Sequence, residues 1–457
     1  MTRDYISIGN AQGFWGDDVD APRRLVAQAP QLDYLTLDYL AEVSLSIMAI
    51  QRDKDPSLGY ARDFIDVVRA LIPFWQEGCS LRLVSNAGGL NPRGCADAVR
   101  KILAEADCPL TVGIVEGDDV LSKLRSDPER FQFHHWETGE ALTDKIGDIV
   151  TANAYIGADQ VAEALAQGAD IVITGRVADP SMAVGCCQHA YGWATDNYDC
   201  LAGATVAGHL IECGTQVTGG ISNQWLELDD PVHIGYPIVH VFQDGSLEVT
   251  KPDGTGGKVD QWTVKEQLLY EIGDPTCYLS PDVCVDFTQV TVEECGPNRV
   301  RVAGAKGKAP TKQYKVSATY RAGWRSEATL TVVGYRAAER ARRAGEVVLQ
   351  RLKARDVVFE KSCIEVLGSG DTVGGVMPAS GTLEAVLRIA VADSDRSKVE
   401  RFGKEIAPLV TSGPAGTTGY TSGRPKARAV FGYWPCLIDR SDVHSTHTLF
   451  HVEEVRT

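Results

Sequence analysis

The chain has no long apolar run. None of its segments approaches the roughly 20 consecutive apolar residues that a membrane-spanning helix needs. The N-terminal residues MTRDYISIGN pass directly into a strand-like segment and do not have the pattern of a signal peptide. We therefore expect a cytoplasmic protein without a membrane partner.

Cysteine pairs of the C-x-x-C type are also missing. The twelve cysteines are spread along the chain, and none belongs to a C-x-x-C pair. This spacing argues against a structural zinc site. Without a secretion signal, free thiols in a reducing compartment are the expected state.

Basic residues are fewer than acidic residues, 45 against 61. The formal net charge is −16, which argues against a general nucleic-acid-binding surface. An anionic small molecule is still compatible with this value, because the charge within the site decides what binds there.

Two nucleotide-binding signatures are absent. The glycines of residues 9–16 have the spacing G-x-x-x-G-x-x-G, whereas dinucleotide-binding loops have G-x-G-x-x-G. The loop 251–258 resembles a phosphate loop only in its glycines, since Pro252 replaces the first glycine and Val259 replaces the final Ser or Thr. The cofactor therefore stays open, and a divalent cation held by acidic residues is one option.

The 457 residues are too many for one ordinary core, so two domains are expected. Residues 1–230 alternate between strand and helix patterns, which predicts an α/β, Rossmann-like domain with a mostly parallel sheet and helices on both faces. The pattern then changes to hairpins and long alternating strands. Residues 231–457 are therefore expected to form an α+β domain with a mixed or antiparallel sheet.

The segment 151–220 shows the repeating unit of the first half most clearly. Apolar residues at helical spacing over 158–166 end at Gly168, as helices commonly do at glycine. The β-branched run Ile171–Ile173 then predicts a strand covered on both faces. The same reasoning predicts helices over 21–28, 39–51, 61–76, 92–106, 199–212, 264–271, 337–352 and 396–406, and strands over 5–8, 32–37, 81–84, 110–115 and 148–152.

Polar residues or glycines follow six predicted strands of the first half. They are Asp17 and Asp18, Asp38, Asn86 with Gly88 and Gly89, Glu116 with Asp118 and Asp119, Asn153, and Arg176 with Asp179. Ligands bind at the carboxyl ends of strands in open parallel sheets, so we expect a polar pocket along this edge. For any single residue the alternative is local, since Asp often caps the next helix and Asn often closes a turn.

Carboxylates gathered around an arginine suit acid–base catalysis. We expect Asp38, Glu116 and Asp119 to act as acid or base. Asn86 and Asn153 are expected to donate hydrogen bonds to a carbonyl or a developing enolate. The expected substrate-binding residues are Asp17, Asp18, Gly88, Gly89, Asp118, Arg176, Asp179 and His209.

Two of these side chains have alternative roles. Arg176 either anchors a substrate carboxylate or thioester-linked phosphate, or only pairs with a neighbouring carboxylate such as Asp179. His209 and Cys213 lie four residues apart and share a helix face. They are either a nucleophile with its base or a buried thiol beside a core histidine.

At several points the chain resembles the acyclic terpene utilisation protein A family. The similar segments are Tyr39-Leu-Ala-Glu42, Asn86-Ala-Gly-Gly-Leu-Asn-Pro92, Glu116-Gly-Asp-Asp119, Ala152-Asn-Ala-Tyr-Ile-Gly157, Thr174-Gly-Arg-Val-Ala-Asp179, Ala207-Gly-His-Leu-Ile-Glu-Cys-Gly214, Lys251-Pro-Asp-Gly-Thr-Gly-Gly257, Gln267-Leu-Leu-Tyr-Glu-Ile-Gly-Asp274 and Ser412-Gly-Pro414. The resemblance covers almost the whole chain. Some members carry an additional small C-terminal domain, which we do not expect here.

The resemblance implies a setting in the degradation of branched acyclic terpenoids, such as citronellol and geraniol, through CoA thioesters. We therefore expect an enzyme of acyl-CoA or organic-acid catabolism, a lyase or hydratase that uses carboxylate acid–base chemistry. The alternatives are a non-catalytic binding subunit of a CoA-dependent carboxylase or hydratase and, less in keeping with the glycine spacing, a nucleotide-dependent oxidoreductase. The expected partners are a small-molecule substrate, such as a CoA thioester, and further copies of the chain in a homo-oligomer.

Overall fold

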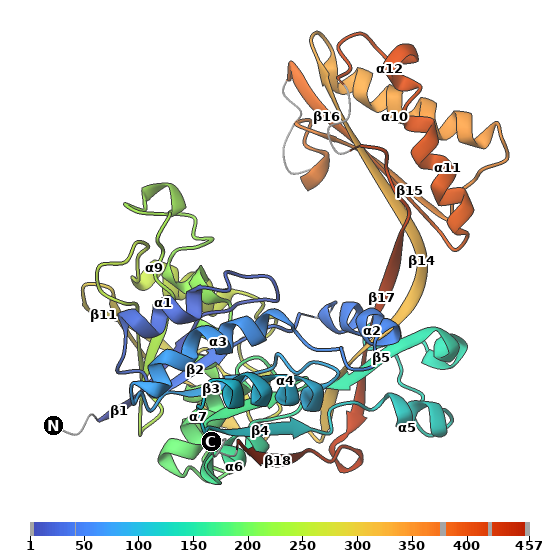
Figure 1. Ribbon diagram of the computed structural model, residues 1–457. Coiled ribbons are helices and arrows are strands. Elements are labelled where there is room, and N and C mark those ends of the chain that lie inside the picture. Colours follow the sequence, from blue (N-terminus) through green and yellow to red (C-terminus); the bar gives the residue numbers. More distant parts are fainter. Residues whose placement is uncertain (1–3, 42, 375–380, 419–422, 453–457) are drawn as a thin grey trace. The chain divides into compact units, whose positions relative to one another are not determined.

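The chain folds into two compact units in the computed structural model shown in Figure 1. The structure describes residues 4–41, 43–374, 381–418 and 423–452. The first unit comprises Met1–Thr319 and Tyr433–Thr457, and the second comprises Tyr320–Gly432. The chain enters the second unit through strand β14 (Gln313–Val333) and returns through strand β17 (Arg428–Asp439).

A ten-stranded sheet forms the centre of the first unit. Its strands are β1 (Tyr5–Asn10), β2 (Tyr34–Leu37), β3 (Arg82–Ser85), β4 (Thr111–Glu116), β6 (Ile171–Thr174), β7 (Ile238–Phe242), β8 (Leu247–Thr250), β11 (Thr291–Gly296), β12 (Arg299–Ala303) and β18 (Thr446–His451). Their order in the sheet is β11-β12-β8-β7-β1-β2-β3-β6-β4-β18. The five strands from β1 to β4 in this order run parallel, and antiparallel strands extend the sheet on both sides.

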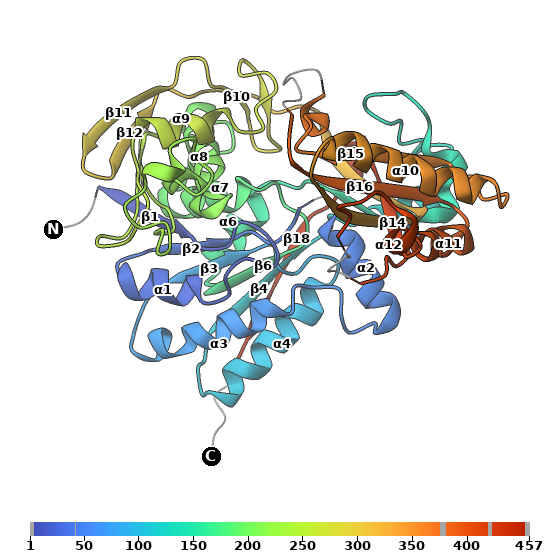
Figure 2. The same ribbon diagram turned by 90° about the horizontal axis from the view of Figure 1, so that it is seen from above.

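Helices cover both faces of the parallel strands, as Figure 2 shows. One face carries α1 (Ala21–Gln28), α3 (Asp63–Gln76) and α4 (Pro92–Glu105), and the other carries α6 (Asp159–Ala166), α7 (Ser181–Tyr191) and α8 (Tyr198–Ile211). Leu35, Leu83 and Ile173 of the strands are fully buried between these layers. This arrangement confirms the predicted α/β class with a mostly parallel N-terminal sheet.

Four strands lie where sequence patterning did not place them. The hairpin β7–β8 follows residue 230, the predicted domain boundary, yet it pairs with β1 inside the first unit. Strand β5 (Ile149–Ala154) was expected in the parallel sheet but pairs with β14 instead. Strand β18, whose residues 446–451 were not among the predicted strands, pairs along its whole length with β4. A strand's own residues show that it is buried, but they do not identify its partner.

The rest of the first unit surrounds the sheet. It contains helices α2 (Ser44–Lys54), α5 (Leu121–Ser126) and α9 (Gln261–Leu269), and a three-stranded sheet of β13 (Lys306–Lys308), β10 (Cys284–Asp286) and β9 (Tyr278–Leu279). Helix α9 begins at Asp260, whose side chain accepts hydrogen bonds from the amides of Trp262 and Thr263.

The second unit contains parts of four strands of a five-stranded sheet, with helices packed against them. Strands β15 (Lys361–Leu367) and β16 (Glu384–Asp393) join β14 and β17 in the order β15-β16-β14-β17. Helices α10 (Ala337–Lys353) and α11 (Arg396–Ile406) contribute Val348 and Phe402 to a core with alternate residues of β16. The antiparallel sheet expected in the C-terminal part is therefore confirmed.

No helix among the described residues is both long enough and apolar enough to cross a membrane.

Candidate functional site

The loops after β2 and β3 meet at the carboxyl edge of the sheet. Asp38 follows β2 directly and Asn86 follows β3. The Asn86 side-chain amide donates a 2.7 Å hydrogen bond to Asp38 Oδ1, and its oxygen accepts one of 2.7 Å from the amide of Tyr39. Two predicted site residues are therefore brought together, and Asn86 fixes the orientation of the Asp38 carboxyl.

The Arg176 guanidinium lies beside them, after β6. Its side chain is only 2% exposed. Nη1 donates to the carbonyl of Leu40 at 2.6 Å and to Asp179 Oδ1 at 2.7 Å, and Cζ lies 4.0 Å from the centre of the Tyr155 ring. Of the two roles that the sequence leaves open for Arg176, pairing with Asp179 is the one present in this structure.

Helix α8 adds a carboxyl group that was not among the predicted site residues. Its last turn leads into Glu212, and Asn10 at the end of β1 donates to the carbonyls of Ile211 and Glu212 at 2.7 and 3.2 Å. Gly208 allows the helix to approach the loop that carries Asp179, because a Cβ atom there would lie 2.6 Å from Pro180 Cα. The position of Glu212 thus depends on backbone contacts at the end of a helix that is buried from Leu201 to Ile211.

Glu212 shares a hydrogen bond with His209. His209 Nε2 lies 2.9 Å from the carbonyl oxygen of Gln267, which can only accept, so Nε2 carries a proton. Burial lowers the pKa of His209 to about 4, so the ring is neutral and Nδ1 is an acceptor. Glu212 Oε1 lies 3.2 Å from Nδ1, and burial raises the pKa of Glu212 well above its usual range. The protonated Glu212 carboxyl is therefore the donor in this hydrogen bond.

Three carboxyl groups here share one cation. Burial, followed by the charge of Asp179, raises the pKa of Asp38 well above its usual value, although Arg176 and Asn86 act in the opposite direction. Asp179 forms the ion pair with Arg176. The cluster therefore holds two neutral acids, Asp38 and Glu212, beside one carboxylate. Such separation of protonation states among neighbouring carboxyls is typical of acid–base sites.

Two cavities meet at this cluster, with volumes of about 380 and 420 Å³. Asp179, Glu212 and Glu271 line both of them. Glu212 Oε2 is buried and has no hydrogen-bond partner among the described residues. A buried polar atom without a partner is costly unless a ligand or water satisfies it, so this oxygen marks the position of a bound group.

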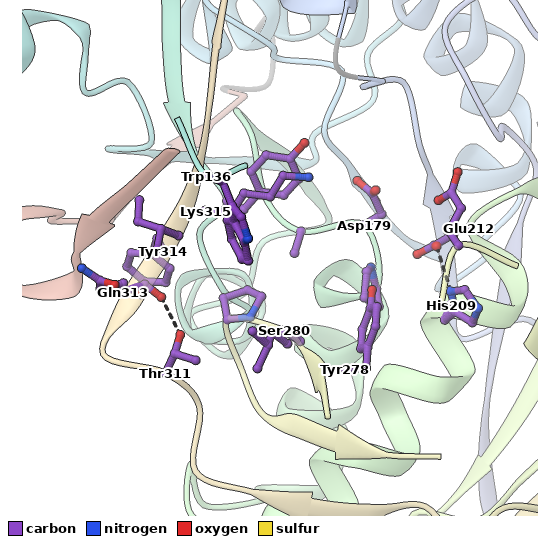
Figure 3. A pocket seen from close by; sticks show the side chains of 17 residues that line it. Trp136, Asp179, His209, Glu212, Tyr278, Ser280, Thr311, Gln313, Tyr314 and Lys315 are labelled. Carbon is purple, nitrogen blue, oxygen red and sulfur yellow. Dashed lines mark hydrogen bonds and ion pairs between the residues drawn. The ribbon is translucent and has the colours of Figure 1, made fainter. Parts of the chain in front are cut away.

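The smaller cavity has two unlike sides. Figure 3 shows Asp179, His209 and Glu212 on one side and Trp136, Tyr314 and Lys315 on the other. Leu279, Pro281 and Leu437 add apolar surface. Its volume lies within the range of small-molecule sites, about 300–1,000 Å³. The cavity can hold an apolar chain with its reactive end at the carboxyl groups.

Asp118 holds the loop that carries Arg176 by hydrogen bonds. Its Oδ2 accepts hydrogen bonds from the Arg176 amide at 2.8 Å and from the Asn153 side chain at 2.7 Å. Burial raises the pKa of Asp118 to about 7 despite these hydrogen bonds. Asp118 therefore contacts the backbone of the site, and Asn153 hydrogen-bonds to Asp118. Neither of these predicted residues lines either cavity.

The raised pKa of Asp118 predicts a pH dependence of stability. The folded protein holds this proton up to about pH 7, whereas the unfolded chain releases it at about pH 4. Between these values the unfolded state binds fewer protons, so the contribution of Asp118 to stability falls as pH rises. The free energy of unfolding, measured with urea, should fall more between pH 5 and pH 8 for the parent protein than for Asp118→Asn.

The adjacent Asp119→Asn variant is the matched control, because Asp119 is exposed. It should lose stability with pH as the parent does. Parallel curves for the parent protein and Asp118→Asn would contradict the assignment.

Several other predicted residues lie outside the cluster. Glu116 pairs with Arg93 at 3.6 Å, and Asp119 Oδ1 accepts from the amide of Leu121 at the start of α5. Asp18 pairs with Arg24 at 2.6 Å. The structure thus gives these three carboxylates local partners, and their expected catalytic or binding roles stay untested.

The remaining predicted residues have mixed positions. Asp17 lines the larger cavity and accepts hydrogen bonds from the Gly13 amide and the Tyr236 hydroxyl, both at 3.0 Å. Gly88 and Gly89 pack inside the protein: a Cβ atom on Gly88 would lie 2.6 Å from the Thr174 carbonyl oxygen. The two glycines allow close packing of the loop.

His209 and Cys213 do not form the catalytic pair that was one alternative. His209 hydrogen-bonds to Glu212 and to the backbone of Gln267. Burial raises the pKa of the Cys213 thiol, which disfavours the nucleophilic thiolate. The described residues also contain no group of three or more His, Cys, Asp or Glu side chains arranged to hold a metal ion.

The sequence interpretation did not select four residues that line the cavities: Glu212, Glu271, Tyr278 and Lys315. Glu212 could have been selected from the sequence, because it follows the last residue of the buried helix and lies about one turn after His209. The other three come from segments after residue 230. No pattern within these segments predicts that they fold back to the cavities.

Comparison with known proteins adds one match. The family model described as "Acyclic terpene utilisation family protein AtuA" matches residues 6–449 of the 457. No curated protein and no solved structure matches the chain significantly.

Proposed function

We propose that this chain, which belongs to the acyclic terpene utilisation family AtuA, is a lyase or hydratase acting on a branched acyclic terpenoid or its acyl derivative. The family match supports the setting in acyclic terpene utilisation. The chemistry is inferred from the carboxyl cluster. The proposed reaction is addition of water to a carbon–carbon double bond, or its reversal.

One observation carries the proposal: the protonated Glu212, whose buried Oε2 atom has no partner among the residues that the structure describes, at the point where two cavities meet. A carboxylic acid kept neutral by burial can deliver a proton at neutral pH. In this structure the proton lies on Oε1, which donates to His209 Nδ1. A half-turn of the carboxyl about its Cγ–Cδ bond exchanges the two oxygens and turns this O–H toward the cavity, where it can be given to a substrate.

The ion-paired Asp179 complements Glu212 as a base. In hydration, Asp179 takes a proton from a water molecule as the water oxygen bonds to one alkene carbon, and Glu212 gives its proton to the other carbon. The C=C π bond breaks, one C–O and one C–H bond form, and the proton gained by Asp179 returns to Glu212 through solvent. Arg176 stays paired with Asp179 as the carboxylate regenerates.

The cavity favours a neutral reactive end. The Asp179 carboxylate lines the reacting side beside the neutral Glu212, and a substrate carboxylate placed there would face like charge. An alkene, a hydroxyl or a thioester carbonyl meets no such repulsion. Any anionic group of the substrate is better placed on the opposite side, near Lys315.

The test is turnover of branched alkenyl thioesters and alkenols in ¹⁸O-labelled water. Incorporation of one labelled oxygen into the product, read by mass spectrometry, is the expected result. A thermal-shift series with the same compounds reports binding separately, since ligands of the native state raise the melting temperature. Tight binding without any turnover would refute the hydratase and support the non-catalytic binding subunit.

A further inference from the structure

A second reactive feature flanks a segment that lines the smaller cavity. Cys277 and Cys284 are seven positions apart, and their Sγ atoms lie 2.7 Å from each other. An S–S bond is about 2.05 Å long, so bond formation needs a shift of well under one ångström. Both cysteines are reduced in this structure. We propose that they are a site of reversible covalent modification, at which an intramolecular disulfide forms.

The two thiols differ in accessibility in a way that suits oxidation. Cys277 is exposed and Cys284 is buried. Burial, with the neighbouring Cys277, raises the pKa of Cys284 to about 11. The exposed thiol therefore meets an oxidant first, and the buried thiol acts as the resolving group.

The reaction needs a low-molecular-weight disulfide such as oxidised glutathione. The Cys277 thiolate attacks one sulfur and forms a mixed disulfide, releasing one glutathione thiolate. Cys284 loses its proton to solvent, attacks Cys277 Sγ and releases the second glutathione. The protein loses two electrons and two protons, and the oxidised glutathione is reduced to two thiols.

The disulfide would close the segment that builds one wall of the cavity. Between the two cysteines lie Tyr278, Leu279, Ser280 and Pro281, which all line the smaller cavity. Strands β9 and β10 pair there, and Asp282 in the turn accepts a 2.7 Å hydrogen bond from the Ala158 amide. Oxidation would therefore restrict the Tyr278 side of the site. The proposed disulfide is independent of the reaction proposed above, since it depends only on the position of this hairpin.

Peptide mapping of the full chain tests the proposal directly. The protein is treated with oxidised glutathione, alkylated, and digested without reduction by a protease that cleaves before aspartate. Cys277 lies in fragment 274–281 and Cys284 in fragment 282–285, so only a disulfide keeps them together. We expect the linked pair as the main product, two hydrogen atoms lighter than the sum of the free peptides. Recovery of both fragments separately would overturn the proposal.

Variants at exposed cysteines provide matched controls that leave the core intact. Cys277→Ser should abolish the linked pair, and Cys295→Ser, at an exposed cysteine further along the chain, should preserve it. Linkage that requires Cys295 would refute the assignment. Hydrogen exchange of the 278–285 amides should slow on oxidation of the parent protein and not of Cys277→Ser. Unchanged exchange would show that the disulfide does not restrict the wall.

Discussion

Glu212→Gln should reduce kcat for the hydration of an active substrate by about 10²–10⁴-fold, the usual contribution of a positioned general acid. Glutamine has the same shape, and its side-chain amide can still donate a hydrogen bond to His209 Nδ1. It cannot give up a proton to the substrate. Stopped-flow or steady-state kinetics should therefore show a large loss in kcat with little change in KM. Urea unfolding should show little loss of stability.

Glu271→Gln is the matched control for this variant. Glu271 lines the same two cavities but is exposed, so its substitution changes the local charge without removing the buried acid. Its effect on kcat should be much smaller. Equal losses in both variants would indicate that net charge, and not proton donation by Glu212, determines the rate.

The pH profile gives an independent check on Glu212. Its pKa is raised by burial, so the acid form is present at neutral pH, and kcat should fall only as pH rises through this raised value. The Glu212→Gln variant should lose this alkaline limb. A rate limited by an ordinary carboxylic acid would instead fall already in the acidic range.

Secondary structure was predictable where the apolar period was strong. The bounds of α1 and α11 agree with the expected helices over 21–28 and 396–406, and β6 differs from its predicted run by a single residue. Within β14 the sequence pattern predicts two separate strands, over 314–320 and 328–333. Gly323 adopts a φ of +88°, but the strand continues through it, paired with β16.

The site was predictable only in its sheet-borne half. Asp38, Asn86, Arg176 and Asp179 follow parallel strands, and the topology of such sheets brings strand ends together. Glu212 reaches the cluster from the end of α8, through backbone contacts with Asn10 that no spacing in the sequence encodes. Burial then determines which carboxyl groups of the cluster are protonated. Burial results from the folded protein as a whole, so no single segment of the sequence predicts it.

The buried position of Arg176 has a consequence that reverses the simplest expectation from the sequence. If Arg176 only anchored a substrate, Arg176→Ala would raise KM and leave the fold intact. In the structure its guanidinium is buried against Asp179, the Leu40 carbonyl and the Tyr155 ring. Removing one partner of a buried ion pair typically costs about 3–5 kcal/mol, because the other charge is left without compensation. Because the Asp179 side chain is 33% exposed, we expect a loss toward the lower end of this range in the free energy of unfolding of Arg176→Ala, measured with urea.

Adding a second substitution separates charge from packing. In Arg176→Met the aliphatic volume is largely retained while the cation is lost, so its stability should also fall. Adding Asp179→Asn to Arg176→Met removes the uncompensated carboxylate and should restore part of that loss, which a double-mutant cycle measures as a coupling energy. Additive effects would mean that the pair does not stabilise the loop. A fully stable Arg176→Ala with only a raised KM would return Arg176 to the role of substrate anchor, and Asp179 would then be a neighbour that the substrate displaces.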